Sequence, residues 1–240
     1  MNQDRIYSAP LKNVGDFEFD DAVADVFPDM IRRSVPGYGS MLTMIAQCGE
    51  RFGQPDTHIY DLGCSLGAGT LLLREHAPAA AKIVAIDNSA AMISRLDGIL
   101  AAQSQPGPVE TRLADIRDMP ILSASLCVLN LTLQFLSVDD RTPLLQKIAD
   151  GTRPGGALLL SEKICFQDET QQQLMTDLHH DFKRAHGYSD LEIAQKRTAI
   201  ENRLVPETLE AHTERLQAVG FRTVTPWFQC FTFASLLAVK

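Results

Sequence analysis

The sequence predicts a doubly wound, Rossmann-like α/β fold, and three observations support that prediction. From about residue 57 onward, short apolar runs typical of β-strands alternate with segments that carry apolar residues at helical spacing. A glycine-rich segment, residues 63–69, separates the first of these strands from the first of these helices. The chain has 240 residues, a length that fits one compact domain. Together these features indicate βαβ units wound around a parallel sheet.

Seven strands are expected, at residues 58–62, 82–86, 109–113, 126–129, 157–161, 221–227 and 231–239. The run from Leu126 to Leu129 is continuously apolar, as in a strand that is buried on both faces. Ser89 follows the second strand and is well placed to cap the next helix. The segment 153–156 predicts a turn before the fifth strand, and a helix over about 207–218 should precede the last two strands.

Two further segments interrupt this alternation of strands and helices. Residues 1–56 predict a helical N-terminal cap, and residues 164–205 predict a helical lid inserted before the final helix. Within the lid, Met175, Leu178 and Phe182 lie at helical spacing. We expect the cap and the lid to pack on one core, so that residues 1–240 form a single domain.

The net negative charge of the chain argues against nucleic acid as a direct binding partner. Thirty acidic residues against 22 basic ones give a net charge of −8. Binding to nucleic acid depends on a basic surface that displaces counterions, so we expect no direct contact with nucleic acid. The longest apolar runs have strand length, and the first residues lack the basic and apolar regions of a secretory leader. We therefore expect no membrane span and a cytoplasmic protein.

The cysteines and histidines do not predict a metal site. The five cysteines are widely spaced and form no Cys-x-x-Cys pair, which is typical of a reducing compartment. His179 and His180 are adjacent on a predicted helix, where neighbouring side chains point about 100° apart. This arrangement favours hydrogen-bonding roles over joint ligation of a metal.

The segment from Asp61 to Gly69 is the first candidate binding site. Its glycines allow the backbone to turn sharply and to approach a ligand closely, and the amides at the start of the next helix can bind an anion. A glycine-rich loop by itself is weak evidence, since it is also what a tight turn between strand and helix requires.

Asp87 strengthens the case for a nucleoside site. It follows Gly63 by 24 residues, at the carboxyl end of the second strand, where its two oxygens can accept both hydroxyls of a ribose. The other interpretation, an acid that caps the next helix, is weakened because Ser89 already supplies a cap. Dinucleotides and S-adenosylmethionine are both bound in this way, and Ser65 interrupts the glycine register that dinucleotides prefer.

With Ser65 in place of the central glycine, the loop resembles the acidic-x-Gly-x-Gly-x-Gly motif of the class I methyltransferases, which bind S-adenosylmethionine. In that family an acid and an apolar residue after the third strand hold the adenine, and here these are Asp115 and Ile116. Asn130 ends the fourth strand on the methionine side of the pocket. The resemblance implies the class I methyltransferase fold, a seven-stranded mixed sheet whose last two strands form an antiparallel pair.

A narrower resemblance covers essentially the whole chain, from Tyr7 to the last strand. Residues 26–30, 34–38, 60–68, 85–89, 129–135, 179–184 and 192–197 resemble the carboxy-S-adenosyl-L-methionine synthase family. The Val-Pro-Gly-Tyr loop that ends at Tyr38 and the lid segments are more specific than the glycine motif. The resemblance implies an enzyme that converts S-adenosylmethionine and prephenate to carboxy-S-adenosylmethionine and phenylpyruvate, with no metal. It also implies a homodimer whose product serves an enzyme that modifies a wobble uridine of tRNA.

The same resemblance implies a set of site residues. The cofactor site would consist of Tyr38, Gly63, Cys64, Ser65, Asp87, Asn88, Asp115, Ile116, Asn130 and Arg197. Arg197 would hold the new carboxylate, a role that suits a planar guanidinium that stays charged. Arg197 and Tyr38 are the predicted catalytic residues.

Other interpretations remain open at the level of the sequence. An ordinary small-molecule methyltransferase would share the nucleoside site but would methylate an acceptor. A non-catalytic protein that binds S-adenosylmethionine would need Asp87 but not Arg197. Arg197 could equally be a solvated helix charge beside Lys196, Tyr38 could be a packing aromatic, and Cys64 is better explained as a small side chain fitted to the loop than as a nucleophile.

Overall fold

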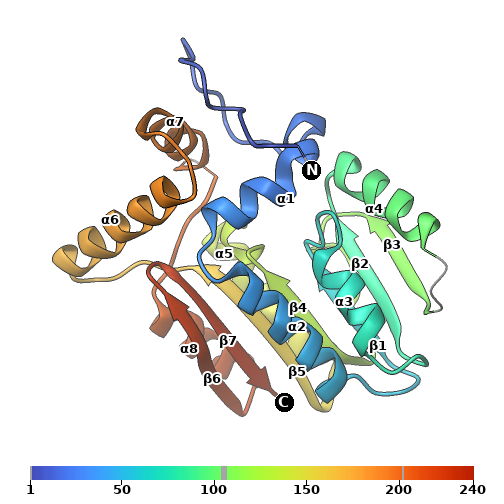
Figure 1. The fold of residues 1–240 in the computed structure, drawn as a ribbon. Helices are drawn as coiled ribbons and strands as arrows, with labels where there is room; N and C mark the ends of the chain where they lie inside the picture. Colours follow the sequence, from blue (N-terminus) through green and yellow to red (C-terminus); the bar gives the residue numbers. More distant parts are fainter. Residues whose placement is uncertain (1, 104–106, 202) are drawn as a thin grey trace.

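The computed structural model describes residues 2–103, 107–201 and 203–240. Met1 and Asn202, which fall in the predicted cap and lid, lie outside the described residues, as do residues 104–106. In the described part of the chain, seven strands form one sheet of order β3-β2-β1-β4-β5-β7-β6 (Figure 1). The strands are β1 (His58–Leu62), β2 (Lys82–Asp87), β3 (Val109–Leu113), β4 (Ala124–Asn130), β5 (Thr152–Lys163), β6 (Thr223–Cys230) and β7 (Phe233–Val239).

The first five strands run parallel, and β7 is antiparallel to both β5 and β6. Helices cover both faces of the sheet, with α2, α3 and α4 on one face and α5 and α8 on the other (Figure 1). The helices are α1 (Asp21–Ser34), α2 (Tyr38–Phe52), α3 (Ala68–His76), α4 (Ala90–Ala102), α5 (Val138–Gly151), α6 (Glu169–Ala185), α7 (Asp190–Glu201) and α8 (Leu209–Ala218), with a short 3₁₀ turn, η1 (Leu133–Phe135). The predicted doubly wound fold with a mixed sheet is confirmed.

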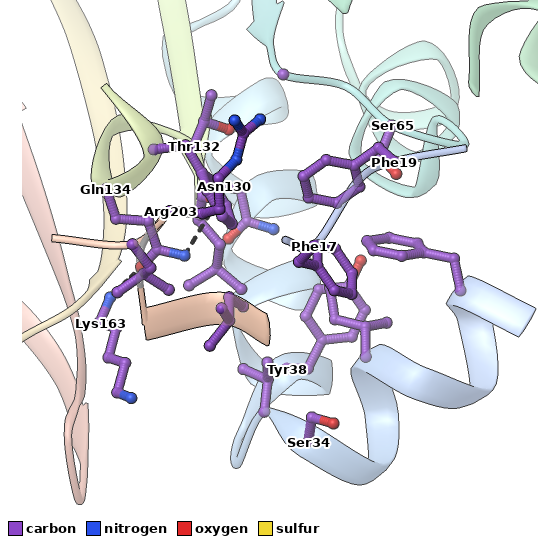
Figure 2. A pocket seen from close by; sticks show the side chains of 18 of the residues that line it. Phe17, Phe19, Ser34, Tyr38, Ser65, Asn130, Thr132, Gln134, Lys163 and Arg203 are labelled. Atoms are coloured by element: carbon purple, nitrogen blue, oxygen red, sulfur yellow. Dashed lines mark hydrogen bonds between the residues drawn. The ribbon is translucent and has the colours of Figure 1, made fainter. Parts of the chain in front are cut away.

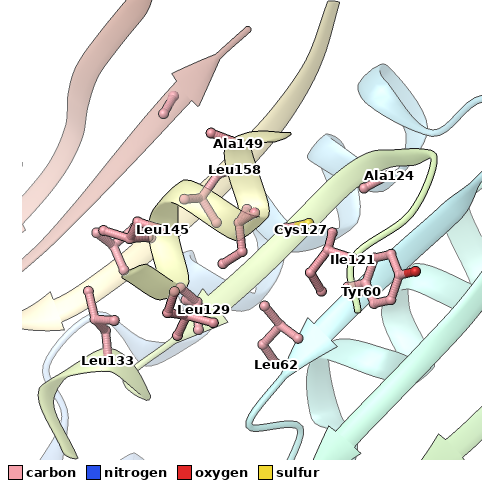
Figure 3. Close-up of a cluster of buried hydrophobic side chains, with 14 of the residues drawn as sticks. Tyr60, Leu62, Ile121, Ala124, Cys127, Leu129, Leu133, Leu145, Ala149 and Leu158 are labelled. Carbon is pink, nitrogen blue, oxygen red and sulfur yellow. The ribbon is translucent and has the colours of Figure 1, made fainter. Parts of the chain in front are cut away.

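The largest apolar cluster lies between the sheet and α5 (Figure 3). Leu62, Leu129 and Leu158 from neighbouring parallel strands meet Leu145 of α5, and all four side chains are fully buried. Burying a leucine side chain contributes about 1.5–3 kcal/mol, so this cluster fixes the ends of β1 and β4 relative to each other. The residues that follow β1 and β4 are therefore held in fixed positions relative to each other.

Several predicted boundaries differ from the structure by two or more residues, among them both ends of β6 and the start of β4 and of β7. Residues 153–156, expected as a turn, belong to β5, which begins at Thr152 opposite Ala124 and contains a register shift. Gly155 has a φ of +77° at this irregularity. The last helix begins at Leu209 rather than near 207, because Thr208 caps it by accepting a hydrogen bond from the amide of Ala211. Strand β6 likewise begins two residues later than expected, at Thr223.

The helical segments at the start of the chain and at 164–205 meet beyond the carboxyl ends of the parallel strands (Figure 1). Their contact centres on Asp4, which is 2% exposed and accepts a 2.5 Å hydrogen bond from the Tyr188 hydroxyl. The Lys196 amine lies 3.6 Å from the same carboxylate. Gln195 of α7 donates to the carbonyl of Tyr7 at 2.9 Å. The first residues of the chain thus fasten α7 in place.

Helix α2 belongs to the predicted N-terminal cap, but it lies along the sheet and packs Ile45 and Cys48 against the strands. Among the described residues, no helix is long and apolar enough to cross a membrane.

Candidate active site

A cavity of about 790 Å³ opens where the strand order reverses, above the carboxyl ends of β1, β2 and β4. In doubly wound folds this crevice is where nucleotide ligands bind. The floor is formed by the glycine-rich loop after β1, and the walls come from α1, α2, α6 and α7. All ten residues predicted from the sequence line this cavity, namely Tyr38, Gly63, Cys64, Ser65, Asp87, Asn88, Asp115, Ile116, Asn130 and Arg197.

The glycine-rich loop has the backbone that its sequence requires. Gly63 has a φ of +81°, and a Cβ atom there would lie 2.3 Å from the Thr132 Oγ1, so a larger residue does not fit. Ser65 also has a positive φ, +52°, a conformation in which a side chain is uncommon. The Ser65 amide donates a 2.8 Å hydrogen bond to Asp87, which holds this turn. Ser65 therefore keeps the left-handed geometry that a central glycine would adopt freely.

Asp87 connects the loop to the second strand. Its Oδ2 accepts from the Ser65 amide and its Oδ1 accepts from the Ser89 amide at 2.9 Å. Burial raises the pKa of Asp87, and these backbone hydrogen bonds oppose the shift. A carboxylate offers about four acceptor positions, so two remain for a ligand. The helix cap is supplied by Ser89, whose hydroxyl accepts from the Met92 amide, as the sequence predicted.

Asp115 and Ile116 form one wall of the cavity next to Asn88. The Arg117 guanidinium donates to Asp115 at 2.7 Å, and this hydrogen bond holds the pKa of Asp115 below its ordinary value. Ile116 is buried in the main core and shows only an edge to the cavity. An ionised acid beside a flat apolar edge fits a heterocycle that carries an amino group. Asn88 is exposed at the mouth.

Asn130, at the end of β4, lines the cavity with its side-chain amide (Figure 2). Its Oδ1 is buried, and no hydrogen-bond partner for it exists among the described residues. Buried acceptors without partners are rare and costly, which makes this atom a candidate ligand contact. A donor such as an ammonium group on a bound molecule would satisfy it.

Asp61 is a site residue that the sequence placed in the loop motif but did not assign to the site. Burial raises its pKa to about 6, the Thr70 hydroxyl lowers it through a 2.6 Å hydrogen bond, and nearby Asp87 raises it. Tyr38 faces the same region, and burial followed by the charge of Asp61 raises its pKa to about 12. Asp61 and Asp87 make this end of the cavity acidic, whereas the Tyr38 phenol stays neutral.

Two other candidates are inert in this structure. Burial raises the pKa of the Cys64 thiol above its ordinary value, so Cys64 is a neutral packing side chain, as expected. The His179 Nε2 lies 2.8 Å from the carbonyl of Ser34, and burial lowers its pKa to about 3. Among the described residues, no three His, Cys, Asp or Glu side chains are grouped as metal ligands.

The opposite end of the cavity is basic. Figure 2 shows Lys163 and Ser65 on opposite sides of the pocket. Besides Arg117, which pairs with Asp115, the basic residues that line the cavity are Arg32, Lys163, Lys183, Lys196, Arg197 and Arg203, and of these Lys163, Lys196 and Arg197 act electrostatically on Lys183. Arg197, for which the sequence left two interpretations, lines the cavity although its side chain is exposed, whereas its neighbour Lys196 is buried. Burial lowers the pKa of Lys183 to about 7, and Lys196, Lys163 and Arg197 add to this effect.

The basic end was missed at the level of the sequence, apart from Arg197, because its members are scattered over the chain. They come from α1, the end of β5, α6, α7 and the segment after α7. No spacing rule links such positions, and only the packing of α6 and α7 over the sheet brings them to one cavity.

Comparison with known proteins agrees with this geometry. The family described as "Methyltransferase domain" matches residues 59–156. Solved structures with the same fold include human N-acetylserotonin methyltransferase in complex with SAM, at 17% identity over 92% of this chain and 55% of that chain, with a TM-score of 0.63. Magnesium protoporphyrin IX methyltransferase from Synechocystis with bound SAH is 12% identical over 95% of this chain and 90% of that chain, with a TM-score of 0.62.

Proteins of much higher identity share the whole length of the chain. Carboxy-S-adenosyl-L-methionine synthase of Vibrio atlanticus is 54% identical over 240 residues, which cover 100% of this chain and 99% of that protein. The synthase of Vibrio cholerae is 53% identical over 239 residues, 99% of this chain and 97% of that protein. With more than half of its residues shared over its full length, the chain belongs to the carboxy-S-adenosyl-L-methionine synthase family.

Proposed function

We propose that this protein converts S-adenosylmethionine and prephenate to carboxy-S-adenosylmethionine and phenylpyruvate. The observation that carries the proposal is that the cavity holds two unlike groups of charged residues, Asp61 with Asp87 at one end and the cluster of Lys163, Lys183, Lys196 and Arg197 at the other. S-adenosylmethionine is a sulfonium cation and prephenate is a dicarboxylate, so the two substrates match these two ends in charge. A methyltransferase that acts on a neutral acceptor would have no need of this cluster of cations.

The acidic end fits S-adenosylmethionine, which is a substrate consumed in each turnover. Asp87 would accept the ribose hydroxyls, and Asp115 with Ile116 would hold the adenine. The unsatisfied Asn130 Oδ1 and the carboxylate of Asp61 suit the ammonium group of the methionine part. Gly63, Cys64 and Ser65 would pass beneath the nucleoside, where the backbone comes closest to a ligand.

The basic end suits the carboxylates of prephenate and of the product. Arg197 is assigned to the new carboxylate of carboxy-S-adenosylmethionine, since a guanidinium meets a carboxylate through two parallel hydrogen bonds. Tyr38, whose high pKa keeps its hydroxyl protonated, would donate a hydrogen bond beside it. The S-methyl group is acidic because the positive sulfur stabilises the adjacent carbanion, and carbon dioxide released from prephenate is captured there.

We further propose that the protein acts as a cytoplasmic homodimer and that its product passes to an enzyme that modifies a wobble uridine of tRNA. A dimer is supported by Leu174 and Leu178, which are 53% and 36% exposed on α6. Light scattering of the Leu174→Glu, Leu178→Glu double variant should give the mass of a monomer. A mass that still corresponds to a dimer would show that these two leucines are not part of the dimer interface.

The reaction is tested by incubating the protein with S-adenosylmethionine and prephenate. Phenylpyruvate and a carboxylated sulfonium nucleoside should form in equal amounts, and S-adenosylhomocysteine should not accumulate. Formation of S-adenosylhomocysteine together with a methylated acceptor would identify an ordinary methyltransferase instead.

A further inference from the structure

The basic end of the cavity holds a half-buried amine, Lys183 of α6. Among the described residues, no carboxylate or carbonyl oxygen makes a hydrogen bond to its Nζ. His179, one turn earlier on the same helix, contacts the Phe233 ring at 5.1 Å between centroids. Phe233 packs beside Tyr38 and Leu131, the residue that follows Asn130. This turn of α6 therefore lies against the residues where the two ends of the cavity meet.

The groups that face Lys183 are cations or neutral imidazoles. Lys196 and Arg197 of α7, Lys163 at the end of β5, and His179 and His180 of its own helix all act on it electrostatically. Helix α1, which packs on α6, carries Arg32, which lines the same cavity, and Arg33, which is paired with Asp29. In such surroundings the amine loses its proton more readily than an ordinary lysine, and a bound dianion would favour the protonated form.

Four other titratable groups of the cavity are less suited to exchanging protons. The Lys196 Nζ is held by the Ser34 hydroxyl at 2.9 Å and by Asp4. His179 is neutral and engaged with a backbone carbonyl. Asp61, with a pKa of about 6, is ionised at neutral pH and has no proton to give. Tyr38 keeps its proton up to a pH of about 12.

We propose that Lys183 carries the proton of the reaction, giving it to the departing hydroxyl of prephenate and taking one back from the S-methyl group. This inference rests on the proposed function, and it adds the acid–base group that function requires. The sequence left the proton acceptor undefined.

The step balances in atoms and electrons. The bond between the ring and its carboxylate breaks, carbon dioxide leaves, and the bonding electrons enter the ring as it becomes aromatic. The ring C–O bond breaks toward the hydroxyl, which takes the proton of the Lys183 ammonium and departs as water. The neutral Lys183 amine then removes a proton from the S-methyl group, and the electron pair left on that carbon forms the bond to carbon dioxide.

The sum is prephenate plus S-adenosylmethionine giving phenylpyruvate, carboxy-S-adenosylmethionine and water. Lys183 ends the cycle as it began, protonated. A group whose pKa lies near the working pH can both give and take a proton, and burial among cations lowers the pKa of Lys183 to about 7. The ammonium is the form that starts the cycle, so the kcat/KM for prephenate should fall as the pH rises above about 7.

The test separates proton transfer from simple attraction of the anion. Lys183→Arg keeps the positive charge but cannot release its proton, whereas Lys183→Met removes both properties. We expect Lys183→Arg to keep the KM for prephenate within a few-fold of wild type while kcat falls by about 10²–10⁴-fold, the usual contribution of a general acid–base. Lys183→Met should lose kcat and raise the KM. Lys82→Arg, at the amino end of β2 and paired with Glu110, is the matched control.

A second readout does not depend on decarboxylation. With phenylpyruvate in place of prephenate in heavy water, wild type should exchange S-methyl hydrogen for deuterium, and Lys183→Arg should not. Turnover of Lys183→Arg close to that of wild type, with the same pH profile, would overturn the role of Lys183 while the proposed function stands. If wild type itself makes no carboxylated nucleoside, the proposed function fails, and the role of Lys183 fails with it.

Discussion

At the scale of single residues, the side chains at the acidic end of the cavity hold the local backbone and are also the proposed ligand contacts. Asp87 accepts two backbone amides that shape the loop and the start of α4, and it still has acceptor positions for a ribose. A substitution there has two effects, which must be measured separately.

Asp87→Ala should weaken the binding of S-adenosylmethionine by about 2–4 kcal/mol, because it removes charge-assisted hydrogen bonds that contribute about 1.5–3 kcal/mol each. Calorimetric titration measures the loss. Asp87→Asn is the companion variant, since it keeps the size of the side chain while removing its charge. An unchanged affinity in folded Asp87→Ala protein would refute the ribose assignment.

Arg197→Leu should leave the affinity for S-adenosylmethionine unchanged and weaken that for carboxy-S-adenosylmethionine by about 3 kcal/mol, on the order of a hundredfold. The reason is that the carboxylate is present only in the second ligand. Arg197→Lys should restore part of the difference, since an ammonium makes no planar two-point contact. Arg112→Leu, on the exposed strand β3, serves as control. Equal losses for both ligands would show that Arg197 does not recognise the carboxylate.

At this scale the sequence predicted which residues line the cavity, because these residues lie at or just after the carboxyl ends of strands. Gly63, Asp87 and Asn130 come directly after β1, in β2 and in β4, so their convergence follows from the strand order. The carboxylate of Asp61 was not assigned to the site, and the structure shows that it lines the cavity while it accepts a hydrogen bond from the Thr70 hydroxyl.

At the scale of elements, the lid is held by the first residues of the chain. Asp4 accepts from the Tyr188 hydroxyl and lies beside Lys196, while the Arg33 guanidinium stacks 3.9 Å from the Tyr188 ring. These contacts join the N-terminal segment, α1 and the lid. The basic end of the cavity therefore depends on a residue that lies outside it.

Asp4→Ala should loosen the lid at a cost of about 1–3 kcal/mol, because a buried hydroxyl and a buried amine each lose a partner. Limited proteolysis should cut residues 164–205 faster, and the KM for prephenate should rise more than that for S-adenosylmethionine. Asp16→Ala, at an exposed position in the same segment, is the control. Equal proteolysis of the two variants would mean that Asp4 does not secure the lid.

Element boundaries were predicted well where strands are apolar and helices are capped by Ser89 or ended by a glycine. They were missed where side chains from distant segments decide them. Glu207 lies 2.5 Å from both Arg141 and Arg215, directly before Thr208, the residue that caps the last helix. The partner Arg141 is 66 positions away, beyond the reach of any local pattern.

At the scale of the whole molecule, a net charge of −8 coexists with a basic cavity. Several of the basic residues line the cavity, where the proposed anionic substrate would bind, and a polyanion as bulky as tRNA would gain little from them. We expect no tight binding of tRNA in a mobility-shift assay at physiological salt. Tight binding that weakens steeply with added salt would indicate a cationic surface for nucleic acid and would contradict a role upstream of the tRNA-modifying enzyme.

The central claim is that carbon dioxide from prephenate becomes the new carboxyl group of the nucleoside. It is tested most directly by supplying prephenate labelled with ¹³C in its ring carboxylate, together with S-adenosylmethionine, and weighing the nucleoside products. We expect the label to appear in a carboxylated sulfonium nucleoside, at the carbon attached to the former methyl group. Label that appears only as free bicarbonate, with S-adenosylmethionine unchanged or converted to S-adenosylhomocysteine, would contradict it.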